Sequence, residues 1–281
     1  MVTSNMGTDE LEKKRRQLGS FSLDGTKRFT HGDFKAESFL EWLEISESLD
    51  NPDLARSAIY FGFQPMLDAL IAGGKGFDRE KALSILDGII NIGTAFLSGY
   101  YSGKPDLDYF RESIKSLRPA TEGAGEIKYT KKFRNVDQNQ IYPKDIKTFI
   151  ETFLDKCLDR SLAVPDYIVG CACGSSEIAM PLAGILGKEL GFIRRSYRRG
   201  DDQPRIVKEH ESAIRRSSSG KTVLCMEDYI CTGLSLKRVM TRVRGYGARE
   251  VIGASVNNSR EGSDVIEVVK QRKFHIYRLG D

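Results

Sequence analysis

Two adjacent carboxylates, Glu227 and Asp228, directly follow an apolar run in the last third of this 281-residue chain. A short turn after them supplies hydroxyl groups and backbone amides at the start of a predicted helix. The free N–H groups of a helix N-terminus bind phosphate well, whereas paired carboxylates suit a neutral diol or a divalent cation. A ligand with a diol on one side and a phosphate on the other, such as a ribose 5-phosphate group, would bridge both features.

The whole stretch 223–235, VLCMEDYICTGLS, resembles the phosphoribosyl-diphosphate (PRPP) binding motif of type I phosphoribosyltransferases. In that family an apolar strand ends in two acids, followed by two variable residues, a small residue, Thr, Gly, a variable residue and Thr or Ser. The resemblance implies that Glu227 and Asp228 hold the ribose hydroxyls and steady the positive charge that grows at the anomeric carbon. It also implies that the 5-phosphate is wrapped by Cys231, Thr232, Gly233, Leu234 and Ser235.

Two upstream segments add to this resemblance. Residues 167–176, YIVGCACGSS, resemble the first strand and pyrophosphate loop of the family, where glycine and small residues let backbone amides approach an anion closely. The loop residues implied to bind pyrophosphate are Ala172, Cys173, Gly174 and Ser175. Residues 192–195, FIRR, resemble the strand that ends in paired basic residues before a long flexible loop. This implies that Arg194 or Arg195 receives the departing pyrophosphate, and that the loop runs from about residue 196 to 219.

Three positions depart from the family pattern, and one of them is Leu234, where relatives often have Gly or Lys. Many relatives carry Arg or Lys where this chain has Cys173, which leaves open that PRPP is bound but not turned over. Purine-salvage relatives place an acid at the position of Cys231, so purine salvage is not supported. The acceptor base therefore stays unassigned.

Strands alternate with helices over residues 142–281, and this alternation predicts an α/β domain with a mainly parallel sheet flanked by helices. The expected strands cover residues 167–170, 192–193, 222–226, 250–256 and 274–279. The expected helices cover residues 143–162, 178–190, 236–243 and 263–271.

No alternation of this kind occurs in the first third of the chain. Helical periodicity over residues 34–49, 54–72, 79–100 and 106–117 predicts a small all-α domain spanning residues 29–120. Residues 1–28 are predicted to be a mobile tail because they are rich in Ser, Gly, Thr and charge. The polar, glycine-containing residues 121–141 are predicted to link the helical domain to the phosphoribosyltransferase-like domain at 142–281.

The positive charge of the chain is concentrated in one segment. Between Arg194 and Arg216 lie eight basic and four acidic residues, an excess equal to the formal net charge of +4 of the whole protein. The rest of the chain has no net charge, which argues against a protein surface that binds nucleic acid generally. The concentrated charge favours a small polyanionic ligand. The chain is 40% hydrophobic with a mean hydropathy of −0.37, which excludes a disordered chain and an integral membrane protein.

Three further sequence features predict where in the cell the protein is located. The apolar stretch 85–97 is interrupted by polar residues and is predicted to be too short to span a bilayer. The N-terminus lacks the apolar core of a secretory signal. Five cysteines without regular spacing fit a reducing cytoplasm, and we interpret them as structural thiols rather than metal ligands.

The resemblance implies an enzyme that transfers ribose 5-phosphate from PRPP to a nitrogenous base and releases pyrophosphate. Mg²⁺ is expected to bind with PRPP, held chiefly by the substrate, with no metal ligated directly by side chains, and a homodimer is expected. The alternative is a catalytically weak or inactive module that binds a protein or nucleic-acid partner through its helical domain or basic loop. Under either hypothesis no membrane partner is expected.

Overall fold

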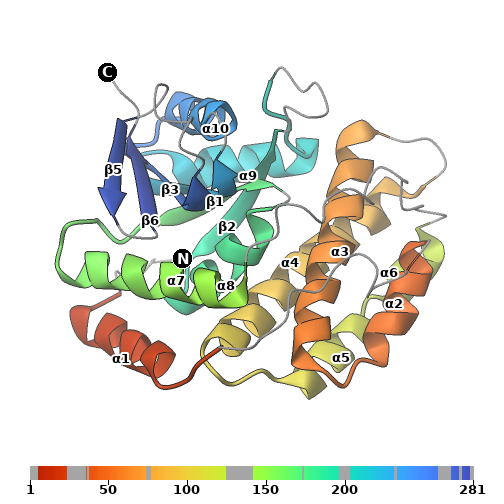
Figure 1. The fold of residues 1–281 in the computed structure, drawn as a ribbon. Coiled ribbons are helices and arrows are strands. Elements are labelled where there is room, and N and C mark those ends of the chain that lie inside the picture. Colours follow the sequence, from red (N-terminus) through yellow and green to blue (C-terminus); the bar gives the residue numbers. More distant parts are fainter. Residues whose placement is uncertain are drawn as a thin grey trace.

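A six-stranded sheet with the strand order β2-β1-β3-β4-β6-β5 forms the centre of the second half of the protein (Figure 1). The computed structural model describes residues 6–23, 36, 38–73, 77–124, 142–172, 174–195, 203–230, 233–258, 267–271 and 274–278. Four strands run parallel: β1 (Tyr167–Ala172), β2 (Glu189–Arg194), β3 (Thr222–Ile230) and β4 (Glu250–Asn258). The predicted parallel sheet flanked by helices is therefore confirmed.

Two antiparallel strands extend the sheet beyond β4. Strand β6 (Phe274–Arg278) pairs with β4, and β5 (Glu267–Gln271) pairs with β6. The prediction of a last helix over 263–271 is wrong for residues 267–271. The β-branched pair Val268-Val269 favours an extended conformation, and β6 offers a free edge to which this segment bonds.

Two layers of helices cover the sheet, α7 (Pro143–Leu158) and α8 (Ser176–Leu186) on one face and α9 (Lys208–Ser218) and α10 (Leu234–Gly245) on the other (Figure 1). Successive side chains of a strand point to opposite faces. Thus Leu224 packs in the hydrophobic cluster that includes α8, whereas Val223 and Cys225 pack with α10. The sheet is therefore buried on both faces, as parallel sheets usually are.

Helix α9 occupies most of the segment that the family resemblance assigns to a long loop. Only Ile214 and Ser218 of this polar helix are buried, so its sequence carries little helical periodicity. The loop prediction is therefore wrong for residues 208–218. Residues 196–202 lie outside the part of the chain that the structure describes.

Five helices occupy the described part of residues 38–124, and side-chain caps fix the starts of several of them. They are α2 (Phe39–Glu47), α3 (Pro52–Ala72), α4 (Arg79–Tyr101), α5 (Leu107–Lys115) and α6 (Arg118–Gly123). Asp78, for example, accepts hydrogen bonds from the N–H groups of Glu80 and Lys81 at the start of α4. Arg118-Pro119, directly after the helix predicted over residues 106–117, begins α6, because proline is tolerated in a first helical turn.

An additional helix, α1 (Thr8–Gly19), lies where the sequence predicts a mobile tail. Leu11 and Leu18 are buried, and Arg15 forms hydrogen bonds of 2.7 and 3.1 Å with the carboxylate of Asp155 on α7. Two leucines seven residues apart share one helix face, which this ion pair fixes against α7. The tail prediction is therefore wrong for residues 8–19.

The helical region and the sheet share one hydrophobic core. The cluster that contains Trp42 and Phe96 continues through α8 to Leu224 and Ile252 of the sheet. Helices α4 and α8 approach closely at Gly93 and Gly184, since a Cβ atom on either residue would collide with the neighbouring helix. The predicted boundaries at residues 120 and 142 stay predictions, and residues 125–141 lie outside the described chain.

Helix α4 is long and apolar enough to cross a membrane by length and composition. The apolar run is therefore not too short for a span, contrary to the prediction, because the helix continues from Arg79 to Tyr101. In the structure, Ile85, Ile89 and Phe96 of this helix are buried in the shared core. The same length and composition are found in core helices of globular proteins.

Candidate active site

The three segments predicted to bind one ligand meet at the carboxyl edge of the sheet. Strands β1, β2 and β3 are parallel neighbours, so their last residues lie side by side, with Ala172 opposite Arg194. Ligands of open α/β sheets bind in this position. The predicted pyrophosphate loop, basic pair and acid pair are therefore brought together, although Cys173, Cys231 and Thr232 lie outside the described residues.

The loop after β1 touches the acid pair directly. A Cβ atom added to Gly174 would overlap the carboxyl group of Asp228. Glycine is thus required because the carboxylate of one strand end lies against the backbone of the neighbouring loop. The hydroxyl oxygen of the next residue, Ser175, is buried and has no hydrogen-bond partner among the described residues. The backbone at Gly174 and the hydroxyl of Ser175 fit the anion that the loop is predicted to bind.

Glu227 and Asp228 face opposite sides of the sheet. Whereas Asp228 lies against the loop that precedes α8, Glu227 accepts a hydrogen bond from the backbone N–H of Leu236 in the first turn of α10. The alternation of a β-strand produces this split. The two neighbouring acids therefore contact different loops.

The surroundings of Glu227 favour its neutral form. Burial raises the pKa of this carboxyl to about 8, and the negative charge of Asp228 adds to the rise. Arg195 and the N–H of Leu236 act in the opposite direction. In the free protein at neutral pH, Glu227 is therefore mainly protonated, and an added positive charge at this edge would favour its ionisation.

The predicted 5-phosphate loop ends in a helix N-terminus. Gly233 caps α10 with a φ of 72°, a left-handed conformation that favours glycine. Its carbonyl accepts the first helical hydrogen bond, 2.9 Å from the N–H of Lys237. Leu234 and Ser235 therefore lie in the first turn, where backbone N–H groups and the helix dipole favour an anion.

Arg194 and Arg195 also diverge, and both are buried. Nη1 of Arg195 donates to Oγ of Ser235 at 3.0 Å, so this guanidinium lies between the basic strand end and α10. Arg194 points to the other side of the sheet, where its Nε pairs with the carboxylate of Asp68 on α3. Asp68 was not predicted as a site residue, although a single acid within the apolar run 65–72 is a signal that could have identified it.

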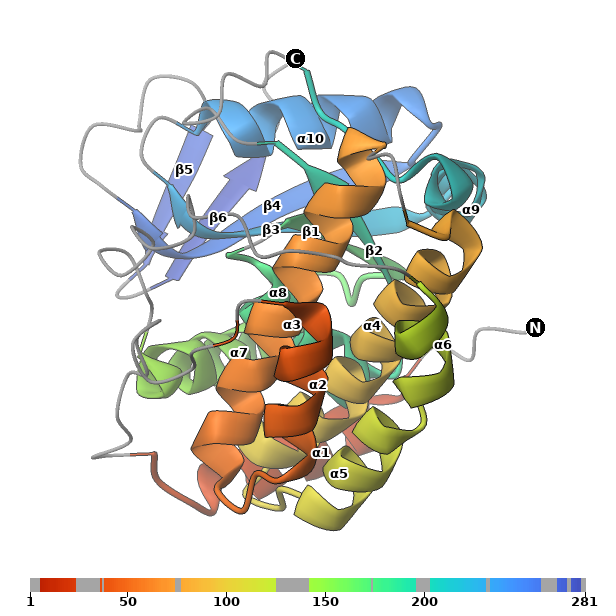
Figure 2. The ribbon, with the colours of Figure 1, turned by 90° about the vertical axis from the view of Figure 1, so that its right-hand side faces the viewer.

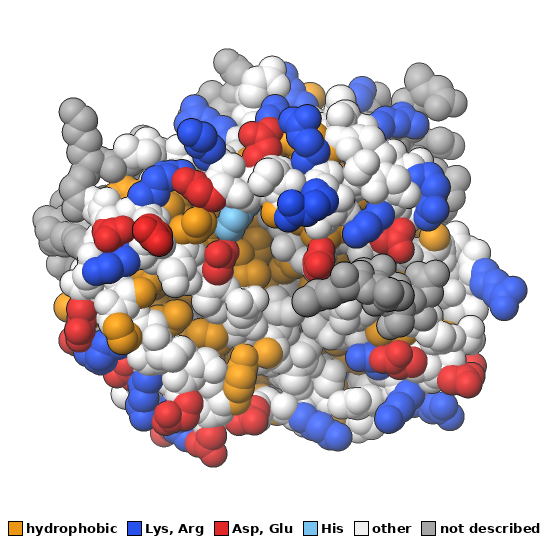
Figure 3. Space-filling view, turned by 180° about the vertical axis from the view of Figure 1, so that it is seen from behind, with side chains coloured by type: hydrophobic (Ala, Val, Ile, Leu, Met, Phe, Trp, Pro, Cys, Tyr) orange, Lys and Arg blue, Asp and Glu red, His pale blue; other side chains and the backbone are white. Residues whose placement is uncertain are grey.

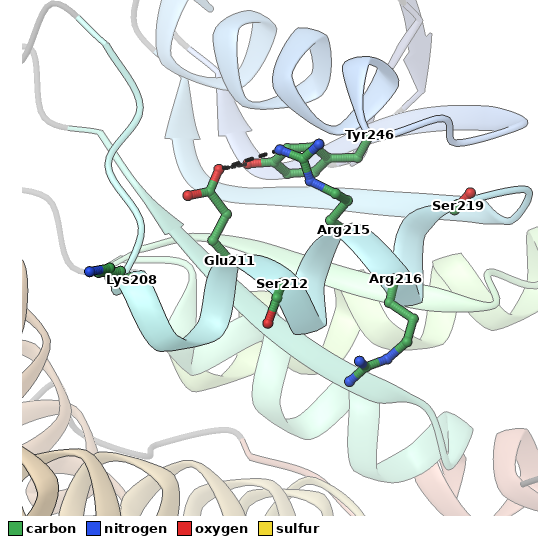
Figure 4. A pocket seen from close by; sticks show the side chains of 7 residues that line it. All are labelled: Lys208, Glu211, Ser212, Arg215, Arg216, Ser219 and Tyr246. Atoms are coloured by element: carbon green, nitrogen blue, oxygen red, sulfur yellow. Dashed lines mark hydrogen bonds and ion pairs between the residues drawn. The ribbon is translucent and has the colours of Figure 1, made fainter.

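Three further basic residues of the charged segment lie on α9. Lys208, Arg215 and Arg216 line a shallow depression of about 520 Å³ beside α9, together with Glu211, Ser212, Ser219 and Tyr246 (Figure 4). Figure 4 shows Arg215 over the ring of Tyr246, with Arg216 extending on the other side of α9. The basic residues of this segment that the structure describes are thus not all gathered at the candidate site, since three of them lie on the outer surface of α9.

Glu211 of this depression already has partners. Its carboxylate accepts hydrogen bonds of 2.8 Å from Arg242 and 2.9 Å from the hydroxyl of Tyr246. The bond from Arg242 is the main cause that lowers the pKa of Glu211. This acid therefore stays ionised and compensates a neighbouring arginine.

The cysteines and possible metal ligands support no separate centre. Cys171 and Cys225 are buried free thiols on β1 and β3, and burial raises the pKa of both. They pack as apolar side chains in the cluster with α10. Among the described residues, no group of three or more His, Cys, Asp and Glu side chains could hold a metal ion.

A mainly parallel sheet with an acid pair, a glycine loop and a helix N-terminus at its carboxyl edge defines an α/β fold whose sheet edge suits a phosphorylated ligand. The model of the phosphoribosyl transferase domain matches residues 135–275. The chain belongs to this phosphoribosyltransferase family, as the resemblance predicted.

Two curated relatives are orotate phosphoribosyltransferases. The one from Deinococcus radiodurans is 33% identical over 94 residues, which cover 34% of this chain and 46% of that protein. The one from Sulfurisphaera tokodaii is 26% identical over 147 residues, covering 48% of this chain and 71% of that protein. The match thus spans about half the length of the first relative.

Among solved structures, a Trypanosoma cruzi hypoxanthine phosphoribosyl transferase shows 17% identity and a TM-score of 0.33. The match covers 48% of this chain and 85% of that chain.

Proposed function

We propose that this protein is a phosphoribosyltransferase that transfers ribose 5-phosphate from PRPP to a nitrogenous base and releases pyrophosphate. The observation that carries the proposal is the contact between Gly174 and Asp228, whose neighbour Glu227 accepts a hydrogen bond from the N–H of Leu236 in the first turn of α10. It joins the predicted pyrophosphate loop, ribose-binding acids and 5-phosphate loop in one site. Family membership supports the same reaction.

In the proposed reaction, residues 231–235 hold the 5-phosphate through backbone amides and the hydroxyls of Thr232 and Ser235. Glu227 and Asp228 hold the ribose hydroxyls and stabilise the positive charge that develops at the anomeric carbon. The bond from this carbon to the pyrophosphate oxygen breaks, and a bond to a nitrogen of the base forms. Catalysis then depends mainly on positioning and electrostatic stabilisation.

The departing pyrophosphate would be received by Arg195 and the backbone amides of residues 172–175. The buried hydroxyl of Ser175 fits this role because it lacks another partner in the described structure. Mg²⁺ bound with PRPP would supply further positive charge against the pyrophosphate. We expect the substrate's pyrophosphate and ribose hydroxyls to be its main ligands.

The names of the curated relatives make orotate the first acceptor to test. Purine salvage is disfavoured because Cys231 replaces the acid that purine-salvage relatives place at this position. A panel of pyrimidine and purine bases with Mg²⁺ and PRPP should show pyrophosphate release with a pyrimidine and none with hypoxanthine or guanine. Turnover of purines alone would contradict this acceptor class.

The reaction itself is tested with Asp228→Asn, which we expect to abolish PRPP-dependent pyrophosphate release while leaving the circular dichroism spectrum unchanged. Glu250→Gln is the matched control, because Glu250 lies at the opposite, amino-terminal end of the neighbouring strand β4. The control should retain activity. Unchanged turnover in Asp228→Asn would refute the proposed role of the acid pair.

A second candidate function, a weak or inactive module that binds nucleic acid, is favoured by one observation. Helix α10 carries four basic residues and no acid, and α9 adds three more on the same side of the sheet. Figure 3 shows Lys and Arg side chains gathered over the upper part of one face, with acids among them. The basic residues of the two helices are Lys208, Arg215, Arg216, Lys237, Arg238, Arg242 and Arg244.

Fluorescence anisotropy with a labelled single-stranded RNA tests this second function. Binding that weakens steeply with salt, and is lost in the double variant Lys237→Glu/Arg244→Glu, would support it. PRPP binding without turnover on any base would add to that support. Pyrophosphate release together with no RNA binding would exclude it in favour of the enzyme.

We also propose that the protein is a cytoplasmic homodimer. The buried free thiols Cys157, Cys171 and Cys225 suit a reducing compartment, whereas the dimer is an expectation from the family. Light scattering coupled to gel filtration measures the oligomeric state, and a monomeric mass would contradict the dimer.

A further inference from the structure

Asp68 connects the helical region to the carboxyl edge of the sheet. It lies on α3, which passes along the β2 side of the sheet in both ribbon views (Figure 1, Figure 2). Its carboxylate pairs with Nε of Arg194, and the two side chains are only 17% and 6% exposed. An arginine buried to this extent needs a partner, because removing one member of a buried ion pair leaves an uncompensated charge.

The contact is part of a larger attachment of α3 to the end of β2. Phe63, less than two turns before Asp68 on α3, packs on Phe192 with a ring-centroid distance of 4.5 Å. Phe192 and Arg194 are two residues apart on β2 and therefore share a face of the sheet. The backbone of Arg194 also exchanges two hydrogen bonds of 2.7 Å with Arg205. The end of β2 is thus held from both its side chain and its backbone.

The next helix of the same region contacts the other side of this junction. Arg79 of α4 forms hydrogen bonds of 2.7 and 2.8 Å with the carboxylate of Glu209 on α9. His210 of α9 lies 2.9 Å from the carboxylate of Asp87 on α4. The helical region therefore contacts both β2 and α9, the two elements that flank the bridge between Arg194 and Arg205.

The direction of Arg194 determines the direction of its neighbour. Since successive side chains of a strand alternate, Arg195 points away from α3 when Arg194 points toward it. On that side Arg195 donates to Ser235 in the first turn of α10 and lies close enough to Glu227 to stabilise its ionised form. Arg195 is therefore the member of the pair that faces the proposed ligand site.

We propose that Asp68 is a positioning residue of the active site, which anchors Arg194 to the helical region and thereby directs Arg195 at the bound PRPP. This inference rests on the proposed function. It assigns a task to the helical region, which supplies the anchor that orients the anion-binding strand end. It also separates the two arginines, with Arg194 as the anchor and Arg195 as the pyrophosphate ligand.

The first test is Asp68→Asn, measured by calorimetry with Mg²⁺ and PRPP and by steady-state kinetics. We expect the Kd and KM for PRPP to rise about tenfold or more, with a smaller change in the KM for the base. Asp68→Glu keeps the carboxylate and should restore most of the affinity. A purely structural role would not raise the KM for PRPP selectively.

Glu47→Gln is the matched control. Glu47 also lies in the helical region, its side chain is likewise 17% exposed, and it accepts hydrogen bonds of 2.6 and 3.2 Å from Arg118. The control thus breaks a similar ion pair that does not involve β2. We expect its KM for PRPP to stay near the wild-type value, so an equal rise in both variants would overturn the proposal.

A second variant covers the case in which Asp68→Asn does not fold. Asp68→Asn/Arg194→Gln removes both charges, so no uncompensated charge stays buried. We expect this double variant to fold and to bind PRPP weakly, since the anchor is missing. Binding at the wild-type affinity by either Asp68→Asn or the double variant would overturn the inference and leave the proposed function intact. Failure of the wild-type protein to bind PRPP would instead refute the proposed function and the positioning role with it.

Discussion

At the scale of single residues, two neighbouring acids have different surroundings because the side chains of a strand alternate between its two faces. Glu227 lies beneath the first turn of α10 in surroundings that favour its neutral form. Asp228 lies against Gly174 on the other side of the sheet. Glu227 therefore gains or loses a proton near neutral pH, whereas Asp228 contacts the predicted pyrophosphate loop.

The raised pKa of Glu227 predicts a pH dependence of stability. Its ordinary value is 4.5 and its folded value is about 8, so between these values the folded protein holds a proton that the unfolded chain releases. The free energy of unfolding should therefore fall as the pH rises through this window. Glu227→Gln should remove roughly 1–3 kcal/mol of that dependence, as measured by urea unfolding between about pH 5 and about pH 8. Equal slopes for wild type and variant would contradict the assignment.

Gly174→Ala tests the contact between the pyrophosphate loop and the acid pair. The added methyl group would collide with the carboxyl group of Asp228, so the loop or the acid must move. We expect PRPP affinity to drop about tenfold or more by calorimetry, with little change in the melting temperature. Gly245→Ala is the control, since a Cβ there meets no atom within 4 Å. Wild-type affinity in Gly174→Ala would show that the contact is not needed for binding.

Local sequence predicts only some of these residues. Glu227, Asp228, Gly233 and Ser235 lie within one short motif, and the resemblance of that motif to the family pattern predicts them as site residues. Asp68 reaches the site through the packing of α3 on β2, which depends on contacts between residues more than a hundred positions apart. The different directions of Arg194 and Arg195 likewise follow from strand parity and could not be read from composition.

At the scale of elements, the crossing of α4 and α8 joins the helical region to the sheet. Gly184→Ala places a methyl group against the carbonyl oxygen of Thr94 and the side chain of Ser98. Overpacking of this kind costs about 1–3 kcal/mol, so the free energy of unfolding should fall by that amount in urea. Gly245→Ala, in an exposed helical turn, should be neutral or slightly stabilising. A stable Gly184→Ala variant would show that the helices separate easily.

The elements that the sequence failed to predict have a common cause. Helix α1 buries only two leucines and α9 buries little besides Ile214, so neither shows the broad apolar stripe of a helix. Strand β5 is short and flanked by charge, and its pairing with β6 decides its conformation. In contrast, α3, α4 and the four parallel strands have long apolar patterns, and the sequence predicted all of them to within a few residues, apart from the longer β2.

At the scale of the whole molecule, one core spans two regions that the sequence divides. Because the hydrophobic cluster runs from Trp42 through α8 to the sheet, we expect a single cooperative unfolding transition. Trp42 is the only tryptophan and is fully buried in the helical region, so its fluorescence reports on that region. Hydrogen exchange of β3 amides reports on the sheet.

The two probes should give the same free energy of unfolding within about 1 kcal/mol. Early loss of the Trp42 signal at low urea, while β3 amides stay protected, would show that the helical region unfolds independently. That result would also weaken the anchoring role of Asp68, because an independent region could not hold the end of β2.

The alternation of side chains between the two faces of β2 and β3 has a consequence for natural variation and for protein engineering. Each strand end carries two like-charged residues in tandem, and the odd and even positions face different halves of the site. Inserting or deleting one residue before Arg194 would exchange the anchor with the ligand-facing arginine while leaving the composition unchanged. Reversing the order of Glu227 and Asp228 would likewise put a longer side chain against Gly174 and a shorter one beneath α10. At these positions the order of two chemically similar residues carries as much information as their identity.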